Sequence, residues 1–119
     1  MKTDRGRMIC NISQYKSMAK KLFGNVEDNF NVDDWFNAIK YFDYKCAYCG
    51  QDRKLVQEHM TPLSIGGTYN KDNVVPSCRT CNNDKRSSDL KTWYKKGSFR
   101  YSDERFNKIE RYIKLMRAQ

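Results

Sequence analysis

The sequence contains no apolar run that approaches the roughly 20 residues needed to cross a membrane. Its charged beginning, residues 1–7, is not followed by the apolar stretch that a secretory signal peptide requires. Apolar residues make up only 39% of the chain, which is low for a protein that must build its own core. We therefore expect no membrane partner, and a small core that is reinforced by a bound metal ion.

Histidine and cysteine are scarce, which makes their positions informative. His59 is the one histidine, and the five cysteines are an odd number with no sign of secretion, which argues against disulfides. Cys10 stands alone and is expected to be a free thiol. The other four cysteines form two Cys-x-x-Cys pairs that bracket the histidine, namely Cys46, Cys49, Cys78 and Cys81.

The two Cys-x-x-Cys pairs predict a structural zinc site. Each pair places two thiolates on one turn, which is the span needed to hold half of a tetrahedral zinc ion. Residues 50–77 are long enough to fold back and bring the pairs together. A site of four cysteines leaves the zinc no open position for a substrate, so chemistry must come from the segment between the pairs, where His59 lies.

The charge balance favours a polyanionic partner. The chain has 23 Lys and Arg against 14 Asp and Glu, which gives a net charge of +9. Nucleic acid is the commonest partner of such a protein, although charge alone leaves a merely soluble basic protein equally open. The same two interpretations hold for Lys16, Lys20 and Lys21, which could contact phosphates or form a solvated helix face.

The spacing of apolar residues predicts a mostly helical α+β domain. The elements that we expect are helices over residues 12–23, 31–44, 79–97 with a break near Ser87 and Ser88, and from Ser102 onward, with short strands at 55–59 and 73–76. Asn31 and Ser102 are predicted helix caps, and the second helix should pack against the zinc knuckle. Residues 1–11 are mostly polar and are expected to be frayed.

The central segment resembles the HNH endonucleases, above all small phage-type members with a four-cysteine zinc knuckle. The resemblance covers about a third of the chain, from Cys46 to Lys85, and is carried by Cys-x-x-Cys, then Glu-His-x-x-Pro-x-x-x-Gly-Gly, then Asn-x-x-x-x-Cys-x-x-Cys-Asn-x-x-Lys. It implies a single nuclease domain over residues 1–119. Its core, at about residues 44–90, would be a zinc-stapled ββα-metal (His-Me finger) fold, a β-hairpin and a helix with a catalytic metal between them.

The resemblance also implies a role for each residue of the motif. His59 matches the general base, Asn73 the residue that orients it, and Glu58 and Asn82 the ligands of a catalytic Mg²⁺ or other divalent cation. The chemistry agrees, because imidazole titrates at about 6.5 and Mg²⁺ prefers a few oxygen ligands and several waters. Lys85, about one turn beyond Asn82, could contact a phosphate or equally be a solvated surface charge.

Three features of the motif leave questions open. The first metal ligand is often aspartate in the family and here is Glu58, and the last is often histidine and here is Asn82, so the preferred cation stays open. Asn83 is a rival to Asn82, because a shift of one residue would exchange them. Glu58 and His59 would lie on opposite faces of a regular strand, so we expect an irregular hairpin that lets both reach one phosphate.

The function implied by the resemblance is metal-dependent hydrolysis of DNA phosphodiester bonds, which nicks or cuts double-stranded DNA, one strand per active site. A double-strand break would need a homodimer or two visits. Two alternatives stay open: a zinc-stapled DNA-binding module without cleavage activity, and an accessory factor that nicks only beside a phage packaging partner. The resemblance further implies a phage-encoded protein in the cytoplasm of a bacterial host cell, and no module that reads a target sequence is recognisable.

Overall fold

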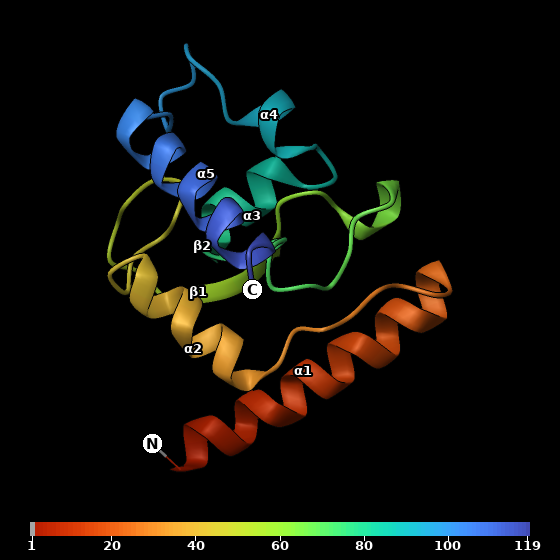
Figure 1. Cartoon of the computed structure of the whole chain (residues 1–119). Coiled ribbons are helices and arrows are strands. Elements are labelled where there is room, and N and C mark those ends of the chain that lie inside the picture. The colour runs from red at the N-terminus through yellow and green to blue at the C-terminus, as the bar shows by residue number, and fades with distance from the viewer. Residues whose placement is uncertain (1) are drawn as a thin grey trace.

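The computed structural model describes residues 2–119, with side chains from Arg5 onward, and shows helices around a two-stranded antiparallel sheet (Figure 1). The expected α+β fold is confirmed. The elements in chain order are α1 (Lys2–Phe23), α2 (Val32–Tyr41), β1 (Leu55–His59), the short 3₁₀ helix η1 (Leu63–Ile65), β2 (Val74–Cys78), α3 (Arg79–Lys85), α4 (Leu90–Trp93) and α5 (Asp103–Arg117).

The first helix is longer than the sequence predicts. Residues 2–11, expected to be frayed, form the first half of α1, and residue 1 lies outside the described residues. The cause is tertiary: the Arg5 side chain donates a 2.8 Å hydrogen bond to Asp33 of α2, and Met8 packs against an apolar cluster. Such tertiary contacts can stabilise a terminal helix even where the spacing of its apolar residues does not predict one.

The second helix begins with the cap that its sequence predicts. The Asn31 side chain accepts a hydrogen bond from the Asp34 amide, and the Asp34 carboxylate accepts one from the Asn31 amide, so two orphan donors are satisfied. The helix ends at Tyr41, a few residues before the expected position. It ends there because Asp43 and Tyr44 adopt left-handed backbone angles, which turn the chain toward Cys46.

The hairpin is regular, and here the sequence-based expectation is wrong. Strand β1 pairs with β2 residue for residue, from Leu55 opposite Cys78 to His59 opposite Val74. No bulge shifts the alternation of side chains over these pairs, so Glu58 and His59 lie on opposite faces of β1. The two side chains therefore cannot meet through a distortion of the strand.

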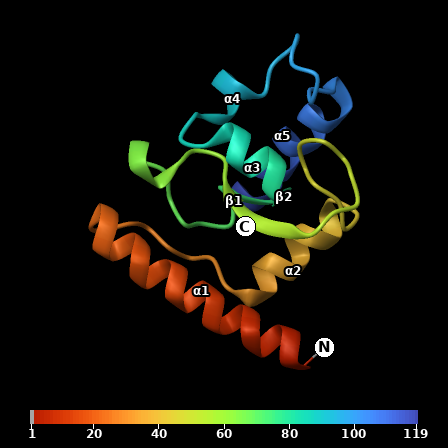
Figure 2. The same cartoon turned by 180° about the vertical axis from the view of Figure 1, so that it is seen from behind.

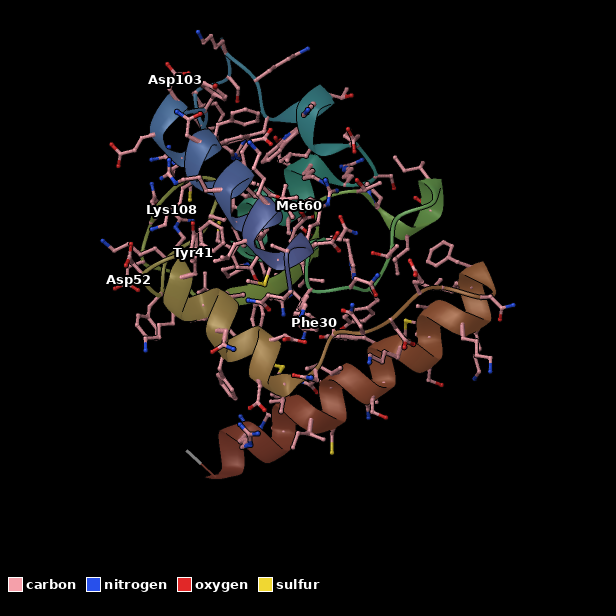
Figure 3. All side chains as sticks on the ribbon, viewed as in Figure 1. Phe30, Tyr41, Asp52, Met60, Asp103 and Lys108 are labelled. Carbon is pink, nitrogen blue, oxygen red and sulfur yellow. The ribbon has the colours of Figure 1, made fainter. Side chains whose placement is uncertain are left out.

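The helical stretch after β2 breaks where it was expected. The α3 helix stops at Lys85, Arg86 has a left-handed φ of 49°, and α4 begins at Leu90. Ser102 caps α5 by accepting a hydrogen bond from the Arg105 amide. Figure 3 shows Lys108 of α5 close to Tyr41, and the ammonium lies 5.6 Å from the centre of that ring.

The elements form two apolar clusters on either side of the hairpin. The larger cluster joins α2, the cysteines, α3 and α5, and it includes Ala38, Phe42 and Ile109, so the expected packing of α2 against the knuckle is confirmed. The smaller cluster lies under α1 around Phe30 (Figure 3). In both ribbon views α1 runs along one side of the molecule, while α4 and α5 lie on the other (Figures 1 and 2). Over the described residues, no helix combines the length and apolarity of a membrane span.

The Asn31 cap gives the first testable prediction. Replacement Asn31→Ala should lower the free energy of unfolding by about 1 kcal/mol, because the Asp34 amide loses its acceptor. Urea unfolding followed by circular dichroism measures the change. The matched control is Asn31→Asp, which keeps an acceptor at the cap and should stay within about 0.5 kcal/mol of the parent protein. Equal losses in both variants would show that the cap contributes nothing.

Candidate metal centre and active site

The four paired cysteines lie together in the geometry of a metal site. Their sulfur atoms are all within 4.8 Å of one another, and the sulfurs of Cys49 and Cys78 are 3.9 Å apart. A tetrahedral zinc ion with zinc–sulfur bonds of about 2.3 Å places its ligands about 3.8 Å apart. The cysteines are therefore positioned to bind a metal ion, and their geometry is compatible with structural zinc.

The backbone of each Cys-x-x-Cys turn fixes the position of the first sulfur through an amide contact. The Cys49 amide points at the Cys46 sulfur and the Cys81 amide at the Cys78 sulfur, each at 3.5 Å. The hydrogen bond from Cys81 and the amides around the site lower the pKa of Cys46 to about 4, so a thiolate, the form that ligates metals, is favoured there. Cys10 is an exposed free thiol, as expected.

Removal of one metal ligand should destabilise the whole fold. Replacement Cys78→Ser should abolish stoichiometric metal binding and markedly lower the midpoint of thermal unfolding, because Cys78 joins β2 to α3 as well as lining the site. Metal content by mass spectrometry and unfolding by circular dichroism report the two effects. The control Cys10→Ser should keep both values, and a parent protein that unfolds identically after chelation would contradict the assignment.

His59 ends β1 in a confined setting. Its ring lies edge-on to Tyr69, with 4.7 Å between ring centres. Its Nε2 atom is buried and has no hydrogen-bond partner in the described part of the chain. Burial, together with the nearby charge of Lys85, lowers the pKa of His59 to about 4. The imidazole is therefore neutral at neutral pH, with a nitrogen free to take up a proton.

The structure places His59 and Asn82 in the same groove. Together with Arg79 they line a hollow of about 310 Å³ whose opposite wall is α1. Asn83 is exposed and does not line this groove, and its carbonyl accepts a hydrogen bond from Arg86. Of the two neighbouring asparagines, Asn82 is thus the one that the fold brings to the histidine.

Glu58 lies on the other face of β1, away from this groove. Its carboxylate is buried, with one oxygen accepting a hydrogen bond from the Tyr48 hydroxyl and the other 3.4 Å from the Lys85 ammonium. Burial raises the pKa of Glu58, and Lys85 and Tyr48 partly oppose the rise. The chain's own groups therefore occupy both oxygens of a residue that the sequence marks as a metal ligand.

Lys85 is buried completely, although the sequence indicated a phosphate contact. Its ammonium lies beside the Glu58 carboxylate and donates a 3.1 Å hydrogen bond to the His59 carbonyl. Lys85 thus holds the backbone of the last residue of β1 from the core side, and its ammonium does not face solvent. Its position on the inner side of α3 follows from packing with a strand 26 residues earlier in the chain, which local spacing does not reveal.

Asn73 holds the loop that follows His59. Its amide oxygen accepts from the Thr61 amide at 2.8 Å, and its amide nitrogen donates to the carbonyls of Thr61 and Thr68 at 2.9 and 2.7 Å. Its backbone carbonyl accepts from Met60. Asn73 thus fixes the backbone on the far side of His59, and the hydrogen bonds of its side chain go to that loop.

Three residues near the site escaped sequence reasoning. Tyr48 binds Glu58, Tyr69 packs against the His59 ring, and Arg79 lines the groove. Arg79 directly follows Cys78 in the sequence. That position, three residues before Asn82, could have predicted a basic side chain near Asn82. Nothing in the local sequence marks the two tyrosines, because their partners are distant in the chain.

The burial of Lys85 gives a prediction that separates a core role from a surface role. Replacement Lys85→Ala should lower the free energy of unfolding by about 3 kcal/mol, because Glu58 keeps a buried charge without its partner. The double variant Lys85→Met with Glu58→Gln should recover a large part of the loss. Urea unfolding without added divalent cations measures both. A Lys85→Ala variant of unchanged stability that binds DNA less well would instead place Lys85 at the surface.

A hairpin followed directly by a helix, clamped by four cysteines and carrying a histidine at the strand end, has the layout expected of a ββα-metal nuclease core. Comparison with known proteins agrees: residues 46–92 match the family model described as HNH endonuclease, which confirms the resemblance for this segment. The matched segment includes the cysteine pairs, His59 and Asn82.

A curated bacterial protein is similar over more of the chain. The chain is 26% identical, over 102 residues and 75% of its length, to "SPbeta prophage-derived putative HNH endonuclease YoqL" of Bacillus subtilis (strain 168). The match covers 44% of that protein, so the chain spans less than half the length of this relative.

Proposed function

We propose that this protein is a metal-dependent endonuclease that hydrolyses DNA phosphodiester bonds. The observation that carries the proposal is the groove in which His59 and Asn82 lie together beside a four-cysteine metal site. The family match over the same segment supports it. The net charge of +9 suits a polyanionic substrate.

His59 is proposed as the general base. Its lowered pKa keeps the imidazole neutral but also makes it a weaker base than free histidine. Its buried, unpartnered Nε2 would accept the proton once the attacking water reaches it. Lys85 and Asn73 fix the backbone at and beyond His59, so the chain that carries the ring is held on both sides of it. Arg79, at the same groove, can pair with the phosphate being cleaved.

Two metal ions are proposed, with separate tasks. Zinc held by the four cysteines is structural, because thiolates fill its coordination shell. A hydrated Mg²⁺ or similar cation, with Glu58 and Asn82 as its oxygen ligands, would supply positive charge to the departing oxygen. The donor types suit such a cation, but Glu58 lies on the opposite face of β1 from the groove that holds Asn82, and its carboxylate is paired with Lys85. The end of β1 would therefore have to rearrange before both residues could bind one ion.

One active site of this kind cleaves one strand. A double-strand break then requires a second copy of the chain or a second binding event. The relative from Bacillus subtilis carries the name "SPbeta prophage-derived putative HNH endonuclease YoqL", and we extend the activity in that name to this chain as part of the proposal. Because the match spans 44% of that protein, partners such as a packaging complex are left to experiment.

The engagement of Glu58 by Lys85 and Tyr48 favours one alternative, a zinc-stapled DNA-binding module without cleavage activity. In that case the ion pair between Glu58 and Lys85 is a permanent part of the core, and Glu58 binds no divalent cation. A binder of this type would retard DNA in a gel and leave it intact under every divalent cation. The neutral, unpartnered imidazole is the feature that such a module does not need.

The decisive test is nicking of supercoiled plasmid in the presence and absence of added Mg²⁺ or Mn²⁺. The parent protein should convert supercoiled to open-circular DNA only when the cation is added. His59→Ala should lower the rate by about 100-fold or more while metal content and unfolding midpoint stay unchanged. Undiminished nicking by His59→Ala would remove this residue from the mechanism.

The neighbouring asparagines provide a matched pair for the same assay. Asn82→Ala should lower the nicking rate and raise the concentration of Mg²⁺ required, because a proposed oxygen ligand is lost. Asn83→Ala changes an exposed side chain outside the groove and should nick like the parent. The reverse pattern would exchange the two assignments.

A further inference from the structure

The groove at His59 continues beyond the candidate active site. A second hollow of about 320 Å³ borders the first, of about 310 Å³, and the two share Tyr15, Val56, Gln57 and Arg79 as lining residues. Together they form one groove between α1 and β1, which we call the α1 groove. It leads from His59 and Asn82 at one end to Arg7 and Lys54 at the other.

The wall that α1 contributes is apolar and open. Tyr15, Met18 and Leu22 are 46%, 57% and 67% exposed, although they lie on a 22-residue helix that contacts the rest of the chain. The helix is anchored through other residues, with Ile12 and Ala19 buried and Met8 in contact with Gln57. The apolar side that faces the α1 groove is thus left without a protein partner in the described structure.

The α1 groove also carries three basic side chains and no acidic one among its lining residues. Arg79 stands at its middle, and Lys54 and Arg7 stand at its far end. None of these three forms an ion pair with a side chain of residues 5–119. Apolar and aromatic side chains along one wall, with unpaired cations along the path, are the combination that binds an unpaired nucleic acid strand.

We propose that the α1 groove binds one unpaired DNA strand, with its bases against Tyr15, Met18 and Leu22 and its phosphates along Arg79 and Lys54. This rests on the proposed function, since the scissile phosphate is taken to lie at His59. The exposed apolar wall can bind the faces of unpaired bases, which a duplex keeps stacked in its interior. The preferred substrate is therefore DNA that is single-stranded, gapped or locally opened.

The test compares three DNAs of one sequence: a single strand, a duplex, and a duplex with an internal unpaired stretch. Affinity is measured by fluorescence anisotropy with the full chain and no added divalent cation, so that cleavage does not interfere. The single strand and the opened duplex should bind at least tenfold more tightly than the intact duplex. With Mg²⁺ present, cleavage should map to unpaired nucleotides.

Substitutions in the wall make the test specific. Tyr15→Ser should weaken binding of the single strand about tenfold, the loss expected for one base–aromatic contact, and leave duplex binding unchanged. Its matched control is Ile9→Ser, an exposed apolar residue of the same helix that does not line the α1 groove. Arg79→Ala should reduce the salt dependence of log affinity by about one, whereas Lys21→Ala, outside the groove, should not.

The outcomes separate this inference from the proposed function. If intact duplex is bound and cut as well as the single strand, the inference fails and the nuclease stands. If the single strand is preferred but no DNA is cut under any cation, the inference about binding stands and the nuclease fails. Equal effects of Tyr15→Ser and Ile9→Ser, or loss of a self-associated state by Tyr15→Ser with unchanged DNA affinity, would show that the α1 groove is not a DNA site.

Discussion

The clamp of four sulfurs is the constraint on which the rest of the structure depends. Cys78 is at once the last residue of β2, the N-cap of α3 and a member of the metal site. A metal ion bound there would fix the angle between the sheet and α3. Since β1 is paired to β2 along its whole length, the same ion would set where His59 lies relative to Asn82.

A chain of buried polar contacts connects this clamp to the candidate base. Tyr48, between the first two cysteines, donates to Glu58, which pairs with Lys85, which in turn donates to the His59 carbonyl. Buried charges are costly unless each has partners, so this network has one low-energy arrangement and rigidifies the end of β1. The same network explains how a core low in apolar residues still holds the histidine in one place.

Much of the architecture was predictable because it follows from local rules. The Cys-x-x-Cys spacing predicted the metal cluster, and the Asn31 and Ser102 caps predicted two helix starts. What failed depends on contacts between distant segments. The first half of α1 is held by Arg5 and Met8, and no period in its own sequence announces it.

In the candidate site, too, the features that follow from local spacing were predictable, and those that depend on contacts between distant segments were not. Motif spacing singled out His59 and Asn82, which the fold brings to one groove. The motif also gave Glu58 as a metal ligand and Lys85 as a possible phosphate contact. In the structure these two side chains pair inside the core, a pairing decided by the packing of α3 on the sheet. The regular hairpin was missed because the expected distortion was inferred from the chemistry, although the sequence carries no bulge signal.

Helix α1 contributes none of the residues proposed for hydrolysis, but it borders the groove that leads to them. The segment that matches the nuclease family, residues 46–92, contains every residue proposed for hydrolysis, while α1 lies outside it and contributes a wall. That wall carries exposed apolar side chains, which lower their free energy only when something covers them. Because the cations along the groove select a polyanion and the apolar wall selects flat, unpaired bases, both walls favour the same occupant. If the proposed function holds, α1 is the element that decides which form of DNA reaches His59.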